Sequence, residues 1–224
     1  MTIGQRLTAI RSEMPPHCRL IAVSKTHPVE TIMEAYASGH RIFGENRVQE
    51  MVPKAETMPK DIEWHMIGTL QRNKVKYIVP FVSLIHSVDS LDVLKEINKQ
   101  ALKVNRIIPC LLQIHIAKEE TKFGFTPEEV LTFLSEGVYK ELPNIRISGL
   151  MGMATFTDNT TQIREEFKAL RSLFDTIKSK MFAGVEMKEL SMGMSSDYKI
   201  AIEEGSTLVR IGTAIFGSRD VQDS

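Results

Sequence analysis

The sequence predicts a single α/β domain, a (β/α)8 barrel of the TIM type with an extra N-terminal helix. Short apolar runs that suit buried parallel strands alternate along the chain with amphipathic stretches that suit helices. About eight such pairs follow one another without a linker or a low-complexity segment. The chain has 224 residues, near the short end of the range for such a barrel. We therefore expect one domain over residues 1–224.

The strands are expected where an apolar run is bounded by turn residues. These runs are residues 19–24, 40–43, 62–67, 83–87, 107–115, 145–150, 187–191 and 207–211. A doubly wound open sheet is the alternative arrangement of the same segments. The first strand is not followed by a G-x-G-x-x-G fingerprint, so a dinucleotide site has no support.

The helices are predicted from apolar spacing and from start and stop signals. Thr126 before Pro127, with Gly137 further on, marks the clearest pair of ends. The helix after Ser90 is expected to bury a face with Leu91, Leu94, Ile97 and Leu102. The other helices are expected at residues 1–13, 28–36, 45–57, 71–76 and 160–180, and from Ser195 onward.

Composition narrows the class of protein. Lys and Arg total 28 and Asp and Glu total 28, which favours neither a nucleic acid nor an anionic membrane surface as partner. The two cysteines, Cys18 and Cys110, have no metal-ligand spacing and form no disulfide framework. No run approaches the length of a membrane span, and the first residues predict an amphipathic helix rather than a signal peptide. We expect a cytoplasmic protein without a metal site.

Lys25 is the first candidate functional residue. It ends the apolar run that begins at Arg19, so it falls at or just past the carboxyl end of the first strand. That end of a parallel barrel carries the chemistry. A lysine against apolar walls loses hydration, which lowers its pKa and makes the amine a better nucleophile toward aldehydes. The alternative is a solvated lysine in a loop.

Two segments after the last two strands predict an anion cradle. They are residues 191–197 and 210–213, and barrels commonly bind phosphate with these loops. Small residues such as Gly212 let backbone N–H groups approach oxygens, and Ser195 and Thr213 add hydroxyl donors. The alternative is a helix cap and a turn glycine. Arg210, within an apolar strand, either pairs with a glutamate or donates to a bound ring atom.

Other polar residues are expected at the same face of the barrel, although each is individually more typical of a structural role. They are Glu45, Asn46, His65, Gln71, Asn73, Lys74, His115 and Lys122. A strand-one lysine with a phosphate cradle indicates an aldehyde that carries a phosphate. Pyridoxal 5′-phosphate (PLP) fits this chemistry, and so does the substrate of a phosphosugar aldolase. The residues alone leave both open.

The chain resembles the pyridoxal phosphate homeostasis family, also called the YggS/PROSC family. The resemblance runs from near the start of the chain to near its end. The matching segments are Ala22–Thr26, Phe43–Asn46, His65–Gly68 with Gln71–Lys74, Gly149–Met151, Leu190–Ser195 with Asp197, and Val209–Gly217.

The resemblance implies a barrel like the N-terminal domain of bacterial alanine racemase, in the fold type III group of PLP proteins. It implies that Lys25 holds PLP as a Schiff base and that Arg210 faces the pyridine nitrogen. The remaining pocket residues that it implies are Ser195, Gly212 and Thr213 at the phosphate, and Asn46, Met192 and Met194 along the walls.

The function implied by the resemblance is to buffer, carry or deliver PLP, without established enzymatic turnover and without catalytic residues. The second domain that completes the racemase site is missing, so we expect a monomer whose partners are PLP and PLP-dependent apo-enzymes. An amino-acid racemase on the same barrel is the alternative, and it needs a second base. Many family members have a lysine where this chain has His27, so Lys122 is the other amine to consider.

Overall fold

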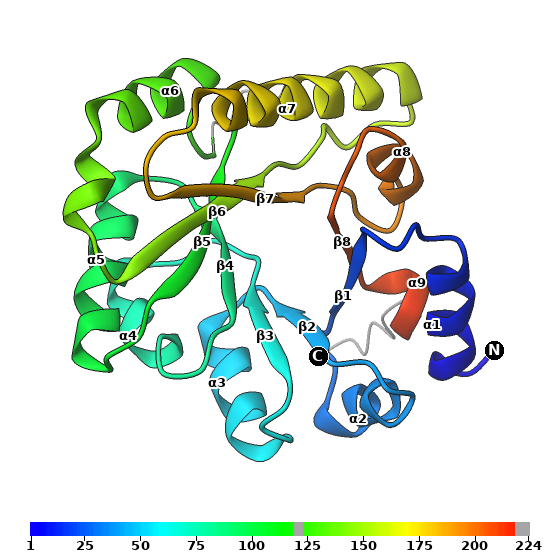
Figure 1. Ribbon diagram of the computed structural model, residues 1–224. Coiled ribbons are helices and arrows are strands. Elements are labelled where there is room, and N and C mark those ends of the chain that lie inside the picture. The colour runs from blue at the N-terminus through cyan, green and yellow to red at the C-terminus, as the bar shows by residue number, and fades with distance from the viewer. Residues whose placement is uncertain (119–122, 218–224) are drawn as a thin grey trace.

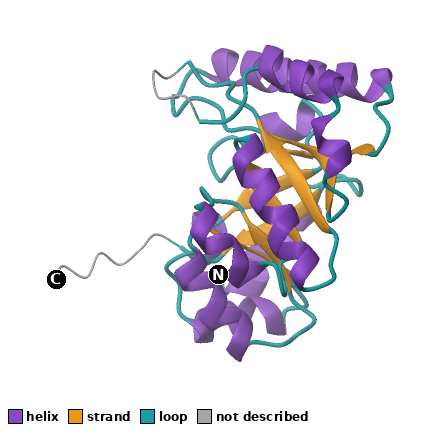
Figure 2. Cartoon of the chain, turned by 90° about the vertical axis from the view of Figure 1, so that its left-hand side faces the viewer, coloured by secondary structure: helices purple, strands orange, loops and turns teal. Residues whose placement is uncertain are grey.

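The computed structural model describes residues 1–118 and 123–217, and its eight parallel strands close into a barrel (Figure 1). Each strand pairs with the next one in the chain, and β8 pairs with β1. Figure 2 shows the strands enclosed by helices. The predicted barrel is confirmed, and the open sheet is excluded.

The strands lie close to their expected positions. The second strand begins two residues later than expected, because the backbone N–H of His40 donates back to the carbonyl of Ala35 in the preceding helix at 3.2 Å. The bounds are β1 Arg19–Val23, β2 Ile42–Glu45, β3 Glu63–Met66, β4 Leu84–Val88, β5 Ile108–Gln113, β6 Ile145–Met151, β7 Val185–Ser191 and β8 Leu208–Ile211.

The helices follow the strands as expected, with two short 3₁₀ turns among them. Thr126 and Glu129 form a reciprocal capping box at the start of α6, and Gly137 ends that helix in the left-handed conformation. The bounds are α1 Ile3–Ser12, α2 Val29–Ala37, α3 Val48–Thr57, η1 Arg72–Lys74, α4 Val75–Ile78, α5 Leu91–Lys103, α6 Pro127–Glu136, η2 Val138–Glu141, α7 Thr160–Lys180, α8 Tyr198–Glu203 and α9 Thr213–Phe216.

The predicted buried face of α5 was wrong at one position. Leu94 and Ile97 are buried, but Leu102 is 63% exposed. At 100° per residue, Leu102 lies about 140° around the helix from Ile97. Ala101 is on the buried face instead, so a smaller side chain closes this end of the helix against the sheet.

Two hydrophobic layers hold the barrel together. Five buried side chains fill its interior, namely Ile21, Leu84, Leu111, Met151 and Leu208. A much larger layer, which includes Ala22 and Phe43, lies between the strands and the helices. Side chains alternate between the two faces of a strand, so Ile21 and Ala22 of β1 belong to different layers.

The additional helix α1 packs beside α9 (Figure 1), and the Arg6 guanidinium donates to the carbonyl of Ile215 at 3.1 Å.

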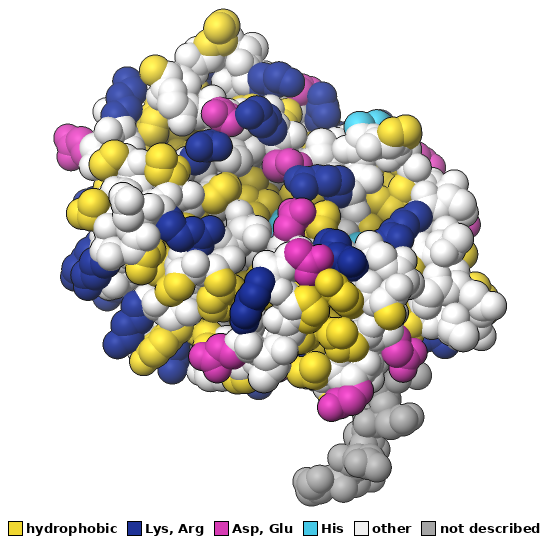
Figure 3. All heavy atoms as spheres, turned by 60° about the horizontal axis from the view of Figure 1, so that its bottom comes forward, with side chains coloured by type: hydrophobic (Ala, Val, Ile, Leu, Met, Phe, Trp, Pro, Cys, Tyr) yellow, Lys and Arg dark blue, Asp and Glu magenta, His cyan; other side chains and the backbone are white. Residues whose placement is uncertain are grey.

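Among the described residues, no helix is long and apolar enough to cross a membrane. The face seen in Figure 3 carries charges of both signs, interspersed with apolar side chains.

Gly149 marks a close approach of two strands. It lies in β6 with a φ of +150°, at a register irregularity between β6 and β7. A Cβ atom built there would overlap the carbonyl oxygen of Glu189 in β7. The backbone of β7 cannot yield without breaking the ladder, so this position requires glycine.

We expect Gly149→Ala to lower the free energy of unfolding by more than about 2 kcal/mol. Gly39→Ala is the matched control, because Gly39 has a φ of +86° but nothing within 4 Å of the added atom. The control should lose only about 1 kcal/mol, from the left-handed conformation. Urea unfolding measures both values, and equal losses would contradict the close-approach argument.

Candidate functional site

Lys25 lies two residues past the end of β1 and is half-buried. The N–H of Ser24 still donates to the carbonyl of Gly44 in β2 at 3.0 Å, so the strand alternation extends at least to Ser24. The Ser24 hydroxyl donates to Glu45 on the helix side, and Lys25 follows it in the turn at the end of the strand. Among residues 1–118 and 123–217, the Lys25 amine has no hydrogen bond or ion pair, so it is available to a ligand.

The two predicted cradle segments meet each other next to β1. The N–H of Gly212 donates to the Ser195 hydroxyl at 3.3 Å. A Cβ atom on Gly212 would lie 3.2 Å from the carbonyl oxygen of Val23, two residues before Lys25. The barrel therefore brings small residues and a hydroxyl to the strand end that carries the lysine. Thr213, the first residue of α9, is exposed beside them.

Ser195 was predicted to start a helix, and this was wrong. Residues 195–197 form a turn, and α8 begins at Tyr198 with Asp197 as its cap residue. The carboxylate of Asp197 turns back and accepts the N–H of Met194. The Ser195 hydroxyl is therefore not used as a helix cap and faces Gly212 instead.

The loop between β7 and α8 is shaped by a glycine. Gly193 has a φ of +97°, and a Cβ atom there would lie 2.5 Å from the Cβ of Ala201. Met192 before it is buried, and Met194 after it is half-buried. The carbonyl of Gly193 accepts the N–H of Arg210 at 2.9 Å, which fixes the loop against β8.

Arg210 is 4% exposed and has no glutamate partner among the described residues. Its guanidinium donates to the Ser191 hydroxyl, and to the carbonyl of Gly152 at 3.1 Å. Burial lowers the pKa of Arg210 to about 10, while the charge of Asp197 acts in the opposite direction. The guanidinium therefore stays protonated at neutral pH inside the barrel.

A chain of hydrogen bonds continues from Arg210 across the barrel. The Ser191 hydroxyl lies 2.8 Å from His86 Nδ1, and His86 Nε2 lies 2.9 Å from His65 Nδ1. A guanidinium can only donate, so the Ser191 hydroxyl accepts from Arg210. Its only other partner among the described residues is His86 Nδ1, so its own hydrogen has an acceptor only if it donates to that atom. His86 then carries its hydrogen on Nε2 and donates to His65. We call these four residues the interior chain.

The sequence reasoning did not identify Ser191 or His86 as part of such a chain. The available signal was a polar residue inside each of four apolar strands, at positions 65, 86, 191 and 210. Period-2 alternation directs each of these side chains toward the barrel interior, but pairing them requires the strand register.

Asn46, Gln71 and Lys74 line one cavity of about 230 Å³ at the same end of the barrel. The backbone of Gly68 lies close to that of Asn46: a Cβ atom on Gly68 would overlap the carbonyl oxygen of Asn46. Asn73 faces a neighbouring groove instead.

His115 is half-buried, and its backbone N–H donates to the carbonyl of Phe125 at 2.9 Å. The ring of His27 packs against Phe216 with 4.8 Å between centroids. Lys122 lies outside the described residues.

Among residues 1–118 and 123–217, no group of three or more His, Cys, Asp or Glu could hold a metal ion.

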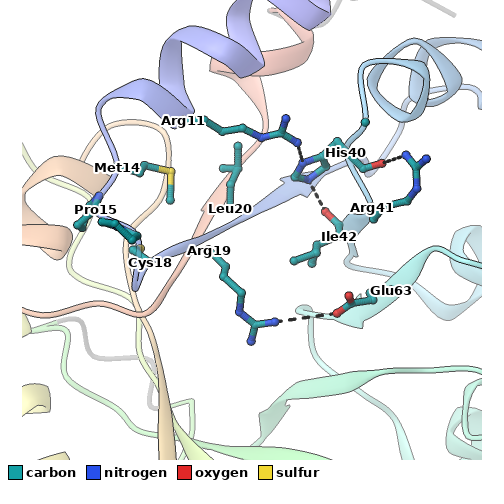
Figure 4. Close-up of a pocket in the computed structure, with 12 residues that line it drawn as sticks. Arg11, Met14, Pro15, Cys18, Arg19, Leu20, His40, Arg41, Ile42 and Glu63 are labelled. Carbon is teal, nitrogen blue, oxygen red and sulfur yellow. Dashed lines mark hydrogen bonds and ion pairs between the residues drawn. The ribbon is translucent and has the colours of Figure 1, made fainter.

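A cavity of about 400 Å³ lies at the opposite end of the barrel (Figure 4). Its charged groups already have partners. Arg19 pairs with Glu63, and Arg11 donates to Nδ1 of His40, whose Nε2–H donates to the carbonyl of Ile42 at 2.8 Å. Because this end of such barrels serves stability, we do not assign a ligand to it.

Comparisons with known proteins agree with this geometry. The family described as the alanine racemase N-terminal domain matches residues 2–220. A relative from Aquifex aeolicus, named pyridoxal phosphate homeostasis protein, is 44% identical over 202 residues, which are 90% of this chain and 87% of the relative.

Two solved structures of PipY from Synechococcus elongatus are also similar. The structure without PLP has a TM-score of 0.91 and 37% identity, and it covers 96% of this chain and 100% of PipY. The structure with PLP bound has a TM-score of 0.87 and 36% identity, with the same coverage.

Three buried histidines predict a loss of stability in mild acid. Burial lowers the pKa of His40 to about 4 and that of His65 to about 3, and holds the pKa of His86 well below its usual range. These rings stay neutral in the folded chain but take up protons when it unfolds below pH 6.5. Each should therefore remove about 2 kcal/mol of stability between pH 7 and pH 5.

Urea unfolding at pH 7 and pH 5 tests this expectation. His40→Gln should reduce the pH-dependent loss by about 2 kcal/mol, whereas His17→Gln, at an exposed position, should leave it unchanged. A His40→Gln variant with the pH dependence of the original chain would rule out the assigned role of His40.

Proposed function

The chain belongs to the pyridoxal phosphate homeostasis family, and from this premise we propose that it binds PLP and buffers, carries or delivers it. The observation that supports this most directly is the contact of Gly212 with Val23. This contact places the anion cradle, formed by residues 191–197 and 210–213, next to the strand end that carries Lys25. An amine and an anion cradle at one strand end suit a ligand with an aldehyde and a phosphate. PLP in the homologous PipY structure is consistent with the proposal.

The donor set fits the aldehyde and the phosphate of PLP. The Lys25 amine would condense with the aldehyde to form a Schiff base, and water would leave. The hydroxyls of Ser195 and Thr213, with the small residue Gly212, would hold the phosphate. Asn46, Met192 and Met194 would line the ring. The relatives of this chain are named as pyridoxal phosphate homeostasis proteins, so PLP is favoured over the substrate of a phosphosugar aldolase.

The presence of Arg210 favours a PLP carrier over a PLP-dependent enzyme. Bound PLP supplies an aldehyde and a ring that can withdraw electrons. The protonated guanidinium of Arg210 would donate a hydrogen bond to the ring nitrogen and, having no acceptor atom, would give that nitrogen no proton to bind. It would thereby keep the electron withdrawal by the ring weak. We therefore propose binding without enzymatic turnover.

A racemase would need a second base opposite Lys25. The buried histidines are engaged within the interior chain: His86 contacts both Ser191 and His65. Their lowered pKa values make them poor proton carriers at neutral pH. We propose PLP-dependent apo-enzymes as recipients. We also propose a cytoplasmic location, in keeping with two unpaired cysteines, and a monomeric state.

Lys25→Ala is expected to abolish covalent attachment of PLP. The visible absorption spectrum of the purified protein is recorded with added PLP, before and after reduction with borohydride. Peptide mapping of the reduced protein then locates the modified lysine. The original chain should turn yellow and yield phosphopyridoxyl on Lys25. Lys74→Ala, which removes another lysine at the same end of the barrel, should behave like the original chain. The absence of phosphopyridoxyl on Lys25 in both the original chain and the Lys74→Ala variant would refute the proposal.

Ser195→Ala is expected to speed the dissociation of PLP by roughly tenfold, equivalent to the loss of one hydrogen bond to a charged group. The absorption maximum should stay unchanged, because the hydroxyl is proposed to contact the phosphate and not the aldehyde. Transfer of PLP to an excess of an apo-enzyme measures the rate. An unchanged dissociation rate would count against the cradle.

A further inference from the structure

We propose that Lys54, together with Glu45 and Glu50, is a positioning cluster that fixes the backbone on both sides of Lys25. It thereby sets the direction of the Lys25 amine. This inference rests on the proposed function, in which Lys25 attaches PLP, and it deepens that function by naming residues that act on the lysine without touching the ligand.

Lys54 holds the residue before Lys25. It is 7% exposed in α3, and its ammonium donates to the carbonyl of Ser24 at 2.9 Å and to Glu45 Oε1 at 2.7 Å. The Ser24 hydroxyl donates to the same carboxylate oxygen at 2.6 Å. Both the backbone and the side chain of Ser24 are therefore tied to the cluster.

Glu50 holds the residue after Lys25. Its Oε2 accepts the N–H of Thr26 at 2.6 Å and lies 3.8 Å from the Lys54 ammonium. Thr26 has a φ of +66°, a left-handed conformation that is unfavourable for a β-branched residue. The bond to Glu50 helps to offset this strain. The turn around Lys25 is thus fastened to α3 at both ends.

The cluster lies on the helix side of the barrel wall. Phe43 and Ala22 belong to the layer between strands and helices, and alternation puts Glu45 and Ser24 on the same side. Among the described residues, no hydrogen bond or ion pair joins the Lys25 side chain to this cluster. The cluster can therefore act on Lys25 only through the backbone, and a small displacement of a reacting amine can slow its reaction substantially.

The charges of the cluster are not explained by stability alone. Glu45 is fully buried, burial raises its pKa, and its Oε2 has no hydrogen-bond partner among the described residues. A buried ion pair is often no more stabilising than well-packed apolar side chains of similar size. A role in fixing geometry accounts for keeping charged groups at this place.

The test compares attachment with plain binding. The double variant Lys54→Met/Glu45→Gln keeps the volume of both side chains and removes both charges of the buried pair, while Glu50, which is partly exposed, still accepts the Thr26 N–H. Attachment is followed by the rise of the visible band and by the borohydride-fixed fraction. Plain binding is measured with pyridoxine 5′-phosphate, an alcohol that cannot condense with an amine. We expect attachment to slow about tenfold and the Kd for the alcohol to change less than twofold.

Two further comparisons separate positioning from general stability. Glu50→Gln keeps an acceptor oxygen for the Thr26 N–H and should attach PLP nearly as fast as the original chain, whereas Glu50→Ala should be slow. Lys60→Met is the matched control, because Lys60 donates to the carbonyls of Ala55 and Glu56, near the far end of α3. It should lower the thermal stability and leave the attachment rate unchanged.

The outcomes are distinct. Attachment by the double variant at the original rate, or an equal loss of attachment and of alcohol binding, would overturn the positioning role. If the original chain attaches no PLP, the proposed function fails, and hydrogen exchange still tests the cluster. The Thr26 amide should exchange at least tenfold faster in Glu50→Ala than in the original chain. Unchanged exchange would overturn the inference.

Discussion

The pairing of β8 with β1 is the contact on which the candidate site depends. Residues near the two ends of the chain meet there, with Ile21 beside Arg210 and Ala22 beside Ile211. Each group is incomplete alone: the Lys25 amine has no polar partner within residues 1–118 and 123–217, and Ser195 and Gly212 belong to turns with small residues. Only closure of the barrel puts them at one strand end. Of the eight strand ends, this pairing therefore singles out those of β1 and β8 as the place of the candidate site.

Much of the fold could be predicted because its signals are local. Apolar runs, capping residues and helix spacing located the strands and the long helix α7. The positions of Lys25, Ser195 and Gly212 at strand ends indicated a site there, and their roles toward a ligand stay predictions. The errors arose from local geometry, within a few residues of each position. Leu102 is exposed because Ala101 is on the buried face, and α8 begins after Ser195 because the carboxylate of Asp197 turns back to Met194.

The interior chain and the Lys54 cluster were not predictable in the same way. Lys54 lies in a helix with other charged residues, and nothing in its neighbours distinguishes a buried lysine from a solvated one. Its burial depends on the distance between α3 and the ends of β1 and β2. Likewise, His65 and His86 are only isolated histidines until the register of β3 and β4 is known. Spacing along the chain does not encode these distances.

The direction of the interior chain has an electrostatic consequence. Every hydrogen in it points away from Arg210, from the guanidinium through Ser191 and His86 to His65. Three polar groups therefore form a line of aligned dipoles with their negative ends toward the buried cation. Such a line adds to the effect of the Asp197 charge on Arg210, as backbone amides stabilise an anion at a helix end. Because the guanidinium can only donate, the first link cannot reverse, and the polarity of the interior chain runs from β8 to β3.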